Sequence, residues 1–141
     1  MEGYRFAIPY SVRVADVNYG GHVANSAVLN FFQDARIAYL AHLGPFGELD
    51  IGEGCGIIVP EARVRYLAEM FLGDRLDIGV RVTEARNSAF VMEYRIEREG
   101  RPTAEGTTSL ISFDYQARRP RRLPPVFRQA MTDFESIRDR G

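Results

Sequence analysis

The chain has 141 residues, 45% of them hydrophobic, and a formal net charge of -1 at pH 7. This length fits one domain, residues 1–141, and the hydrophobic fraction argues against disorder. A nearly neutral chain has no global field that attracts nucleic acid or an anionic membrane. The single cysteine, Cys55, excludes an intrachain disulfide, and no apolar run is long enough to span a membrane. We therefore expect a cytoplasmic protein with neither a nucleic-acid nor a membrane partner.

The first elements in chain order are a strand and a helix. Residues 4–14 alternate between apolar and polar side chains, which predicts a half-buried strand, and Pro9 places part of it at a sheet edge. Residues 25–43 change to the 3-4 apolar spacing of a helix. Asn25 or Ser26 is its candidate N-cap, and Gly44-Pro45 ends it. Because apolar residues occupy most of its circumference, we expect other elements to surround this helix.

The second half of the chain reads as strands separated by short breaks. After a glycine-rich link, residues 44–56, the strand patterns cover 57–70 (as one or two strands), 75–85, 89–98 and 103–114, and a weak helix follows at 125–138. Short breaks predict antiparallel hairpins. The expected class is α+β, with a curved antiparallel sheet on the long helix. A second layer from a partner subunit would complete the burial, so we expect a dimer.

Residues 15–25, ADVNYGGHVAN, carry the densest group of polar side chains and glycines. They lie between the first strand and the long helix. Backbone N–H groups at a helix start lack intrahelical acceptors, and glycine lets a ligand approach the backbone closely. The stretch is therefore a candidate oxyanion site, or else simply the turn that leads into the helix.

Five motifs in order resemble one family over nearly the whole chain. They are D-x-[DN]-x-x-G-H-V-x-N at residues 16–25, a variant of E-x-A-R at 33–36, a Tyr66 to Gly73-Asp74 lead, A-x-G at 104–106, and a basic-Pro turn at 119–124. Together they resemble the hotdog-fold acyl-CoA thioesterases of the 4-hydroxybenzoyl-CoA thioesterase type.

The resemblance implies an antiparallel five- to six-stranded sheet wrapped round one long central helix. It implies a homodimer with a continuous sheet, often paired into a homotetramer, with active sites at the subunit interface. The implied reaction hydrolyses an acyl-CoA to a carboxylic acid and free CoA. No metal and no cofactor are expected, because coenzyme A is part of the substrate.

One position departs from the family pattern. The second acid of the family's D-x-D element, which acts as nucleophile or general base, is Asn18 here. An amide is not a base, so another carboxylate is needed. Asp16 would share a strand face with Asn18, Glu61 starts a strand that could face the loop from the partner subunit, and Asp34 lies near the family's helix glutamate. Each also has a purely structural interpretation. Asp16 would anchor the loop, Glu61 would be a solvated acid at a strand end, and Asp34 would form an ion pair with a nearby arginine.

The remaining site predictions concern polar and small residues. Asn18 could orient water or the carbonyl group, and His22 is either a base or a packing residue at the helix start. The predicted substrate-binding residues are Tyr19, Gly20, Gly21, Val23 and Asn25.

The basic run Arg118 to Arg122 has three interpretations. It binds the phosphates of coenzyme A, it forms a solvated turn, or it contacts nucleic acid, which the overall charge disfavours.

Two other functions remain open. Asp16-Val17-Asn18 followed by His22 resembles the D-x-N-x-x-H element of the (R)-specific enoyl-CoA hydratases, although the spacing to the histidine is one residue longer. The loss of the family carboxylate at position 18 is also consistent with a non-catalytic acyl-CoA or acyl-carrier binding module.

Overall fold

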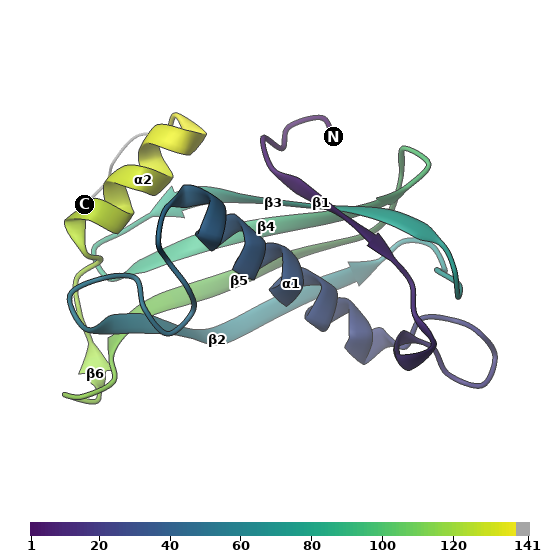
Figure 1. Ribbon diagram of the computed structural model, residues 1–141, viewed down its shortest axis with the longest axis horizontal. Coiled ribbons are helices and arrows are strands. Elements are labelled where there is room, and N and C mark those ends of the chain that lie inside the picture. Colours follow the sequence, from purple (N-terminus) through teal and green to yellow (C-terminus); the bar gives the residue numbers. More distant parts are fainter. Residues whose placement is uncertain (138–141) are drawn as a thin grey trace.

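The computed structural model describes residues 1–137, which form six strands and two α-helices (Figure 1). In chain order the elements are β1 (Ala7–Ser11), a 3-10 helix (Val14–Asp16), α1 (Asn25–Leu43), β2 (Cys55–Tyr66), β3 (Arg75–Ala85), β4 (Ala89–Arg98), β5 (Arg101–Asp114), β6 (Arg119–Pro120) and α2 (Pro125–Glu135). Neither helix in this part of the chain is long and apolar enough to span a membrane.

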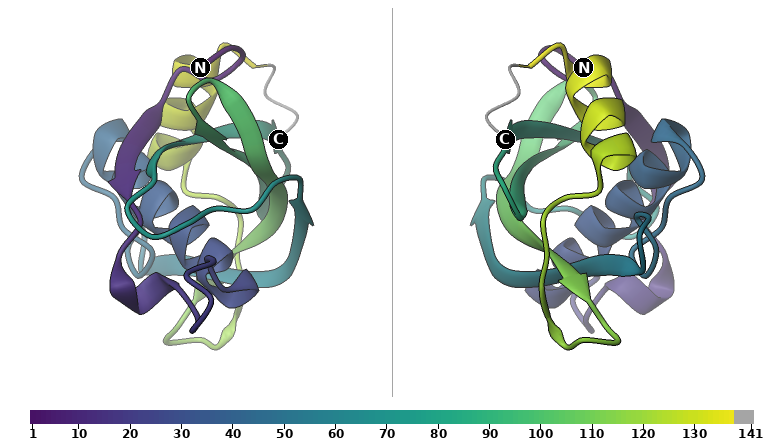
Figure 2. Two further views of the ribbon diagram at one scale, coloured as in Figure 1. Left: turned by 90° about the vertical axis from the view of Figure 1, so that its right-hand side faces the viewer. Right: turned by 90° about the vertical axis from the view of Figure 1, so that its left-hand side faces the viewer.

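The strands form one antiparallel sheet in the order β1-β3-β4-β5-β2, and β6 pairs with the end of β5. Seen along the long axis of the molecule, the sheet curves round α1 (Figure 2). The α+β fold class and the predicted hairpins are confirmed. Strand β1, which contains Pro9, lies at one edge as its proline predicts, and β2 lies at the other.

Several element boundaries differ from the predictions. The first strand is confined to Ala7–Ser11, because the chain turns into the 3-10 helix at Val14. The pattern over 57–70 is one strand that ends at Tyr66, so Glu61 lies inside β2 and not at its start. Its pairing with β5 shifts register between Ile58 and Glu61, where Pro60 cannot donate to the ladder. Helix α2 ends at Glu135, and residue 138 of the predicted helix lies outside the described residues.

Helix α1 has the predicted bounds but a different cap. The N-cap is Ala24, whose side chain makes no capping hydrogen bond, and Asn25 is already the first helical residue. Phe31 and Phe32 are buried against the sheet, whereas Leu29 and Ile37 are 43% and 46% exposed. The chain by itself therefore covers only part of the apolar circumference of this helix.

A glycine sets the distance between α1 and the sheet. A Cβ atom on Gly106 of β5 would collide with the ring of Phe32 and would lie 2.9 Å from the carbonyl oxygen of Arg63. The Phe32 ring stacks on Tyr94 with its centroid 4.6 Å away. The A-x-G motif thus has a packing role, because only glycine lets the helix lie this close to β5.

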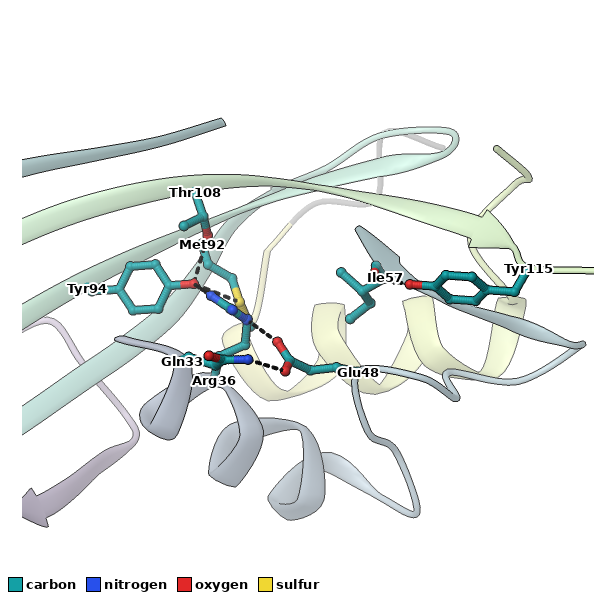
Figure 3. A network of polar contacts seen from close by, with 8 residues as sticks. All are labelled: Gln33, Arg36, Glu48, Ile57, Met92, Tyr94, Thr108 and Tyr115. Atoms are coloured by element: carbon teal, nitrogen blue, oxygen red, sulfur yellow. Dashed lines mark hydrogen bonds and ion pairs between the residues drawn. The ribbon is translucent and has the colours of Figure 1, made fainter. Parts of the chain in front are cut away.

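One buried cation joins α1, the sheet and the 44–54 loop (Figure 3). Arg36 is 7% exposed, donates to Glu48 at 2.7 Å and donates to the Tyr94 hydroxyl at 2.9 Å. Gln33 donates to the other Glu48 oxygen at 2.9 Å, and Thr108 lies 2.7 Å from the Tyr94 hydroxyl. The buried charge is therefore paired and hydrogen-bonded, as burial of a guanidinium requires.

Replacing Glu48 with alanine leaves Arg36 buried without its counter-charge. We expect Glu48→Ala to lower the free energy of unfolding by about 3 kcal/mol, because an unpaired buried cation is strongly destabilising. Urea unfolding monitored by circular dichroism measures this change. The matched control is Glu93→Ala, which breaks the half-exposed pair with Arg81 and should cost at most about 1 kcal/mol. Equal losses in the two variants would contradict the role of the Arg36 pair.

Candidate active site

A pocket of about 590 Å³ opens where the start of α1 meets the end of β2. These two element ends lie toward the right of Figure 1. The loop before α1 and the segment after β2 form its walls. The lining residues are Asn18, His22, Val23, Ala24, Asn25, Val28, Tyr66, Leu67, Ala68, Glu69 and Met70. The structure thus brings four predicted site residues into one pocket: Asn18, His22, Val23 and Asn25.

The loop before α1 is a tight turn closed by Asn18. Its N–H donates to the carbonyl oxygen of His22 at 3.0 Å, and its own carbonyl accepts from Gly21 at 3.0 Å. The Asn18 side-chain oxygen accepts from the Gly20 N–H at 3.1 Å. Gly21 has a φ of 78°, which favours glycine. Both glycines therefore shape the turn and do not line the pocket.

Most backbone donors of this loop are already used. The N–H of Val23 donates to the carbonyl oxygen of Met70 at 2.8 Å, and the N–H of Ala24 donates to the backbone carbonyl oxygen of Asp16 at 2.9 Å. The loop therefore uses most of its own N–H groups, in its turn and in bridges to neighbouring segments. Within the described chain, the N–H groups of Asn25 and Ser26 have no hydrogen-bond acceptor. They form the positive end of the α1 dipole.

The first turn of α1 is also tied to β2. The Tyr66 hydroxyl donates to the carbonyl oxygen of Asn25 at 3.0 Å. Val28 and Met70 are 1% and 4% exposed and give the pocket an apolar floor. The pocket thus combines free helix-start N–H groups with an apolar surface, which suits a carbonyl group attached to a carbon chain.

Asp16 lies behind this turn and not in the pocket lining. It belongs to the 3-10 helix, so the expectation that it shares a strand face with Asn18 is wrong. Its Oδ2 atom accepts from the Tyr10 hydroxyl at 2.7 Å and from the Arg13 N–H at 2.8 Å. These contacts match the loop-anchor alternative. A catalytic role for Asp16 stays a prediction.

The other predicted carboxylates lie away from the pocket lining. Glu61 is on β2 and its side chain is 64% exposed, 3.7 Å from Arg63. Asp34 is exposed on α1 and makes no ion pair with the described residues. Their catalytic roles also stay predictions.

The structure adds one acidic residue that was not among the predicted site residues. Glu69 follows β2, lines the pocket, and holds its Oε1 atom 3.2 Å from Nδ1 of His22. The only sequence signal was its place between Tyr66 and Gly73-Asp74, in a segment interpreted as the end of a strand.

The remaining predicted binding residues are further from the pocket. Tyr19 is fully exposed at the tip of the turn, at 112%. The basic run surrounds β6, which lies at the opposite end of the molecule from the start of α1 (Figure 1). Arg121 donates there to Asp114 at 3.1 Å and to the carbonyl oxygen of Glu53 at 3.0 Å. Binding of CoA phosphates by this run stays a prediction.

Residues 1–137 contain no group of three or more acidic, His or Cys side chains that could hold a metal ion.

Comparison with known proteins decides the family. Residues 12–131 match the family model of the thioesterase-like superfamily. This chain belongs to that superfamily.

Relatives support the same assignment. A 1,4-dihydroxy-2-naphthoyl-CoA hydrolase of Synechococcus elongatus is 26% identical over 80% of this chain and 85% of its own length. An L-carnitine dehydrogenase/betainyl-CoA thioesterase of Agrobacterium fabrum is 28% identical over 82% of this chain, which spans only 24% of that longer protein.

A solved structure has the same shape over almost its whole length. A Thermus thermophilus thioesterase, in complex with coenzyme A and Zn, is 30% identical, with a TM-score of 0.87 over 98% of this chain and 99% of its own. Family, fold and relatives together identify an acyl-CoA thioesterase. The thioesterase prediction is confirmed, and neither the hydratase nor the binding-module alternative is favoured.

Alkaline titration tests the anchor role of Asp16. Burial and the hydrogen bond to Asp16 raise the pKa of Tyr10 to about 12. The pKa of a tyrosine in the unfolded chain is about 10. Because the pKa of Tyr10 is higher in the folded state, Tyr10 adds to the free energy of unfolding below pH 10, and this contribution is lost as the pH rises toward 12. We expect Asp16→Asn to lower the pKa of Tyr10 and to flatten the loss of stability between these values. Tyrosinate absorbance and urea unfolding measure the two effects.

Tyr10→Phe is the control for that titration, since it removes the signal of Tyr10 and leaves those of the other tyrosines. If Asp16→Asn titrates like the unmodified chain, the Asp16 carboxylate does not hold Tyr10.

Proposed function

We propose that the pocket at the start of α1 is where this thioesterase hydrolyses its acyl-CoA. The observation that carries the proposal is the position of the unpaired Asn25 and Ser26 N–H groups, within the described chain, beside an apolar pocket. A thioester carbonyl oxygen bound there gains negative charge as water attacks its carbon. Preorganised N–H donors and the positive helix end stabilise that charge, and one such donor is worth about 2.7–4 kcal/mol.

The substrate would enter with its acyl group over Val28 and Met70 and its pantetheine arm toward the open side. The side-chain amide of Asn18 lines the same pocket, with its oxygen committed to the Gly20 N–H. Its NH₂ group is therefore the part that orients water or the carbonyl oxygen. This assigns Asn18 a binding role in place of the family's carboxylate.

Filling the pocket should stop turnover. Ala68 lines the pocket and is exposed, so Ala68→Trp fits without disturbing the core. Thiol release from short, long and aromatic acyl-CoAs should fall at least about tenfold, since a displaced substrate loses its aligned geometry. Val126→Trp, at a 75% exposed position on α2, is the control and should keep full activity. Equal activity in both variants would place the reaction elsewhere.

We also propose that the protein works as a homodimer joined at the free edge of β2, with pairing into a homotetramer as a further step. This strand has 12 residues and no neighbour on one side among the described residues. Val59, Tyr66 and Leu67 are 39%, 48% and 41% exposed on β2 and just after it. An open edge of this length pairs readily with a second strand. A cytoplasmic location remains a prediction of the sequence.

Light scattering after size exclusion tests the dimer. We expect a mass at least twice that of the chain, and a smaller mass for Val59→Lys, because a charge on an edge strand opposes strand pairing. Val126→Lys adds the same charge on α2 and should leave the mass unchanged. A monomeric mass for the unmodified protein would overturn the dimer.

A further inference from the structure

The described side of the pocket holds one acid and one imidazole, and the two are in contact. Glu69 and His22 come from different loops, and their Oε1 and Nδ1 atoms lie 3.2 Å apart. No other lining residue can take a proton from water near neutral pH, because the rest are apolar residues, two asparagines and a tyrosine.

Both partners are held in place by further contacts. The His22 ring packs on Phe71 with its centroid 4.9 Å away, and a backbone bridge joins the same two residues. The carbonyl oxygen of Glu69 accepts from Arg98 at 2.8 Å. The backbones of both residues and the His22 ring are therefore held in place, and the two side chains are 40% and 68% exposed.

We propose that His22 is the general base of this thioesterase and that Glu69 is its positioning residue. This inference rests on the proposed function, since it assigns the proton transfer in the same pocket. A carboxylate at Nδ1 keeps the proton on that nitrogen and leaves the lone pair on Nε2. The missing acid at position 18 is thus replaced by an imidazole with its own carboxylate.

The proton balance of the reaction follows from this arrangement. Nε2 of His22 takes a proton from water as the water oxygen forms a bond to the thioester carbon. The tetrahedral intermediate then collapses, and its carbon–sulfur bond breaks. The Nε2 proton passes to the leaving sulfur, which gives free CoA and a carboxylic acid. Glu69 stabilises the imidazolium between the two steps and is never protonated.

Other charged groups near the pair are few among the described residues. Arg98 faces the Glu69 backbone and pairs with Asp74 at 2.7 Å. Asp74 in turn accepts from the Phe71 N–H at 2.8 Å. These two charges offset one another, so the Glu69 carboxylate is the charge that acts directly on the His22 ring.

Two substitutions test the pair with thiol-release kinetics over a range of pH. His22→Gln should lower kcat by roughly 10²–10⁴-fold with little change in KM, because it removes the base and keeps the pocket. The fall of activity at acid pH, which reports protonation of the base, should disappear with it. Glu69→Gln should lower kcat roughly 10–100-fold, and Glu69→Asp should restore part of the loss. Glu99→Gln, an exposed acid on the β4–β5 turn, is the matched control and should be unchanged.

The outcomes separate this inference from the function on which it rests. An unmodified protein that releases no thiol from any acyl-CoA overturns the proposed function itself. An active protein whose His22→Gln variant keeps kcat within about threefold overturns the pair alone. Because Glu69 is exposed, Glu69→Gln tests the pair even if His22→Gln does not fold, and an unchanged kcat and pH profile in that variant would equally overturn it.

Discussion

The close packing of α1 on β5 is the contact on which the rest of the molecule depends. Gly106 lets Phe32 approach the sheet, Tyr94 stacks on that ring, and Arg36 joins the helix to Glu48 on the following loop. Phe32 and Arg36 lie one helical turn apart on α1, so their contacts fix both the depth and the rotation of the helix. The start of the helix is thereby placed at the end of β2, where the pocket forms.

On the proposed function, that position accounts for a thioesterase site that lacks the carboxylate expected at position 18. The helix start supplies N–H donors and a positive dipole, which are backbone properties and survive any change of side chain. The base is a side-chain property and can be supplied by another residue. His22 and Glu69 meet because the two segments that carry them pair through the backbone, at His22 with Phe71 and at Val23 with Met70.

Local patterns in the sequence predicted the elements well and their ends less well. The period of apolar residues identified α1 and the strands β3 to β5, because such patterns depend on neighbours in the chain. Two local details changed the ends and the pairing of strands. The chain before α1 leaves the strand early, since Asp16 bonds back to Arg13, and Pro60 interrupts the β2 ladder without ending the strand.

The sequence by itself determined the fold class, the family and the stretch around residues 16–25, because ordered motifs and apolar periods are properties of the linear chain. Only the tertiary structure decided which of those residues share a pocket. Asp16 turned out to hold Tyr10, most loop N–H groups proved to be engaged, and Glu69 came to His22 from a distant part of the chain. The physical reason is that hydrogen bonds between remote segments are set by the packing of the helix on the sheet, and no local pattern records them.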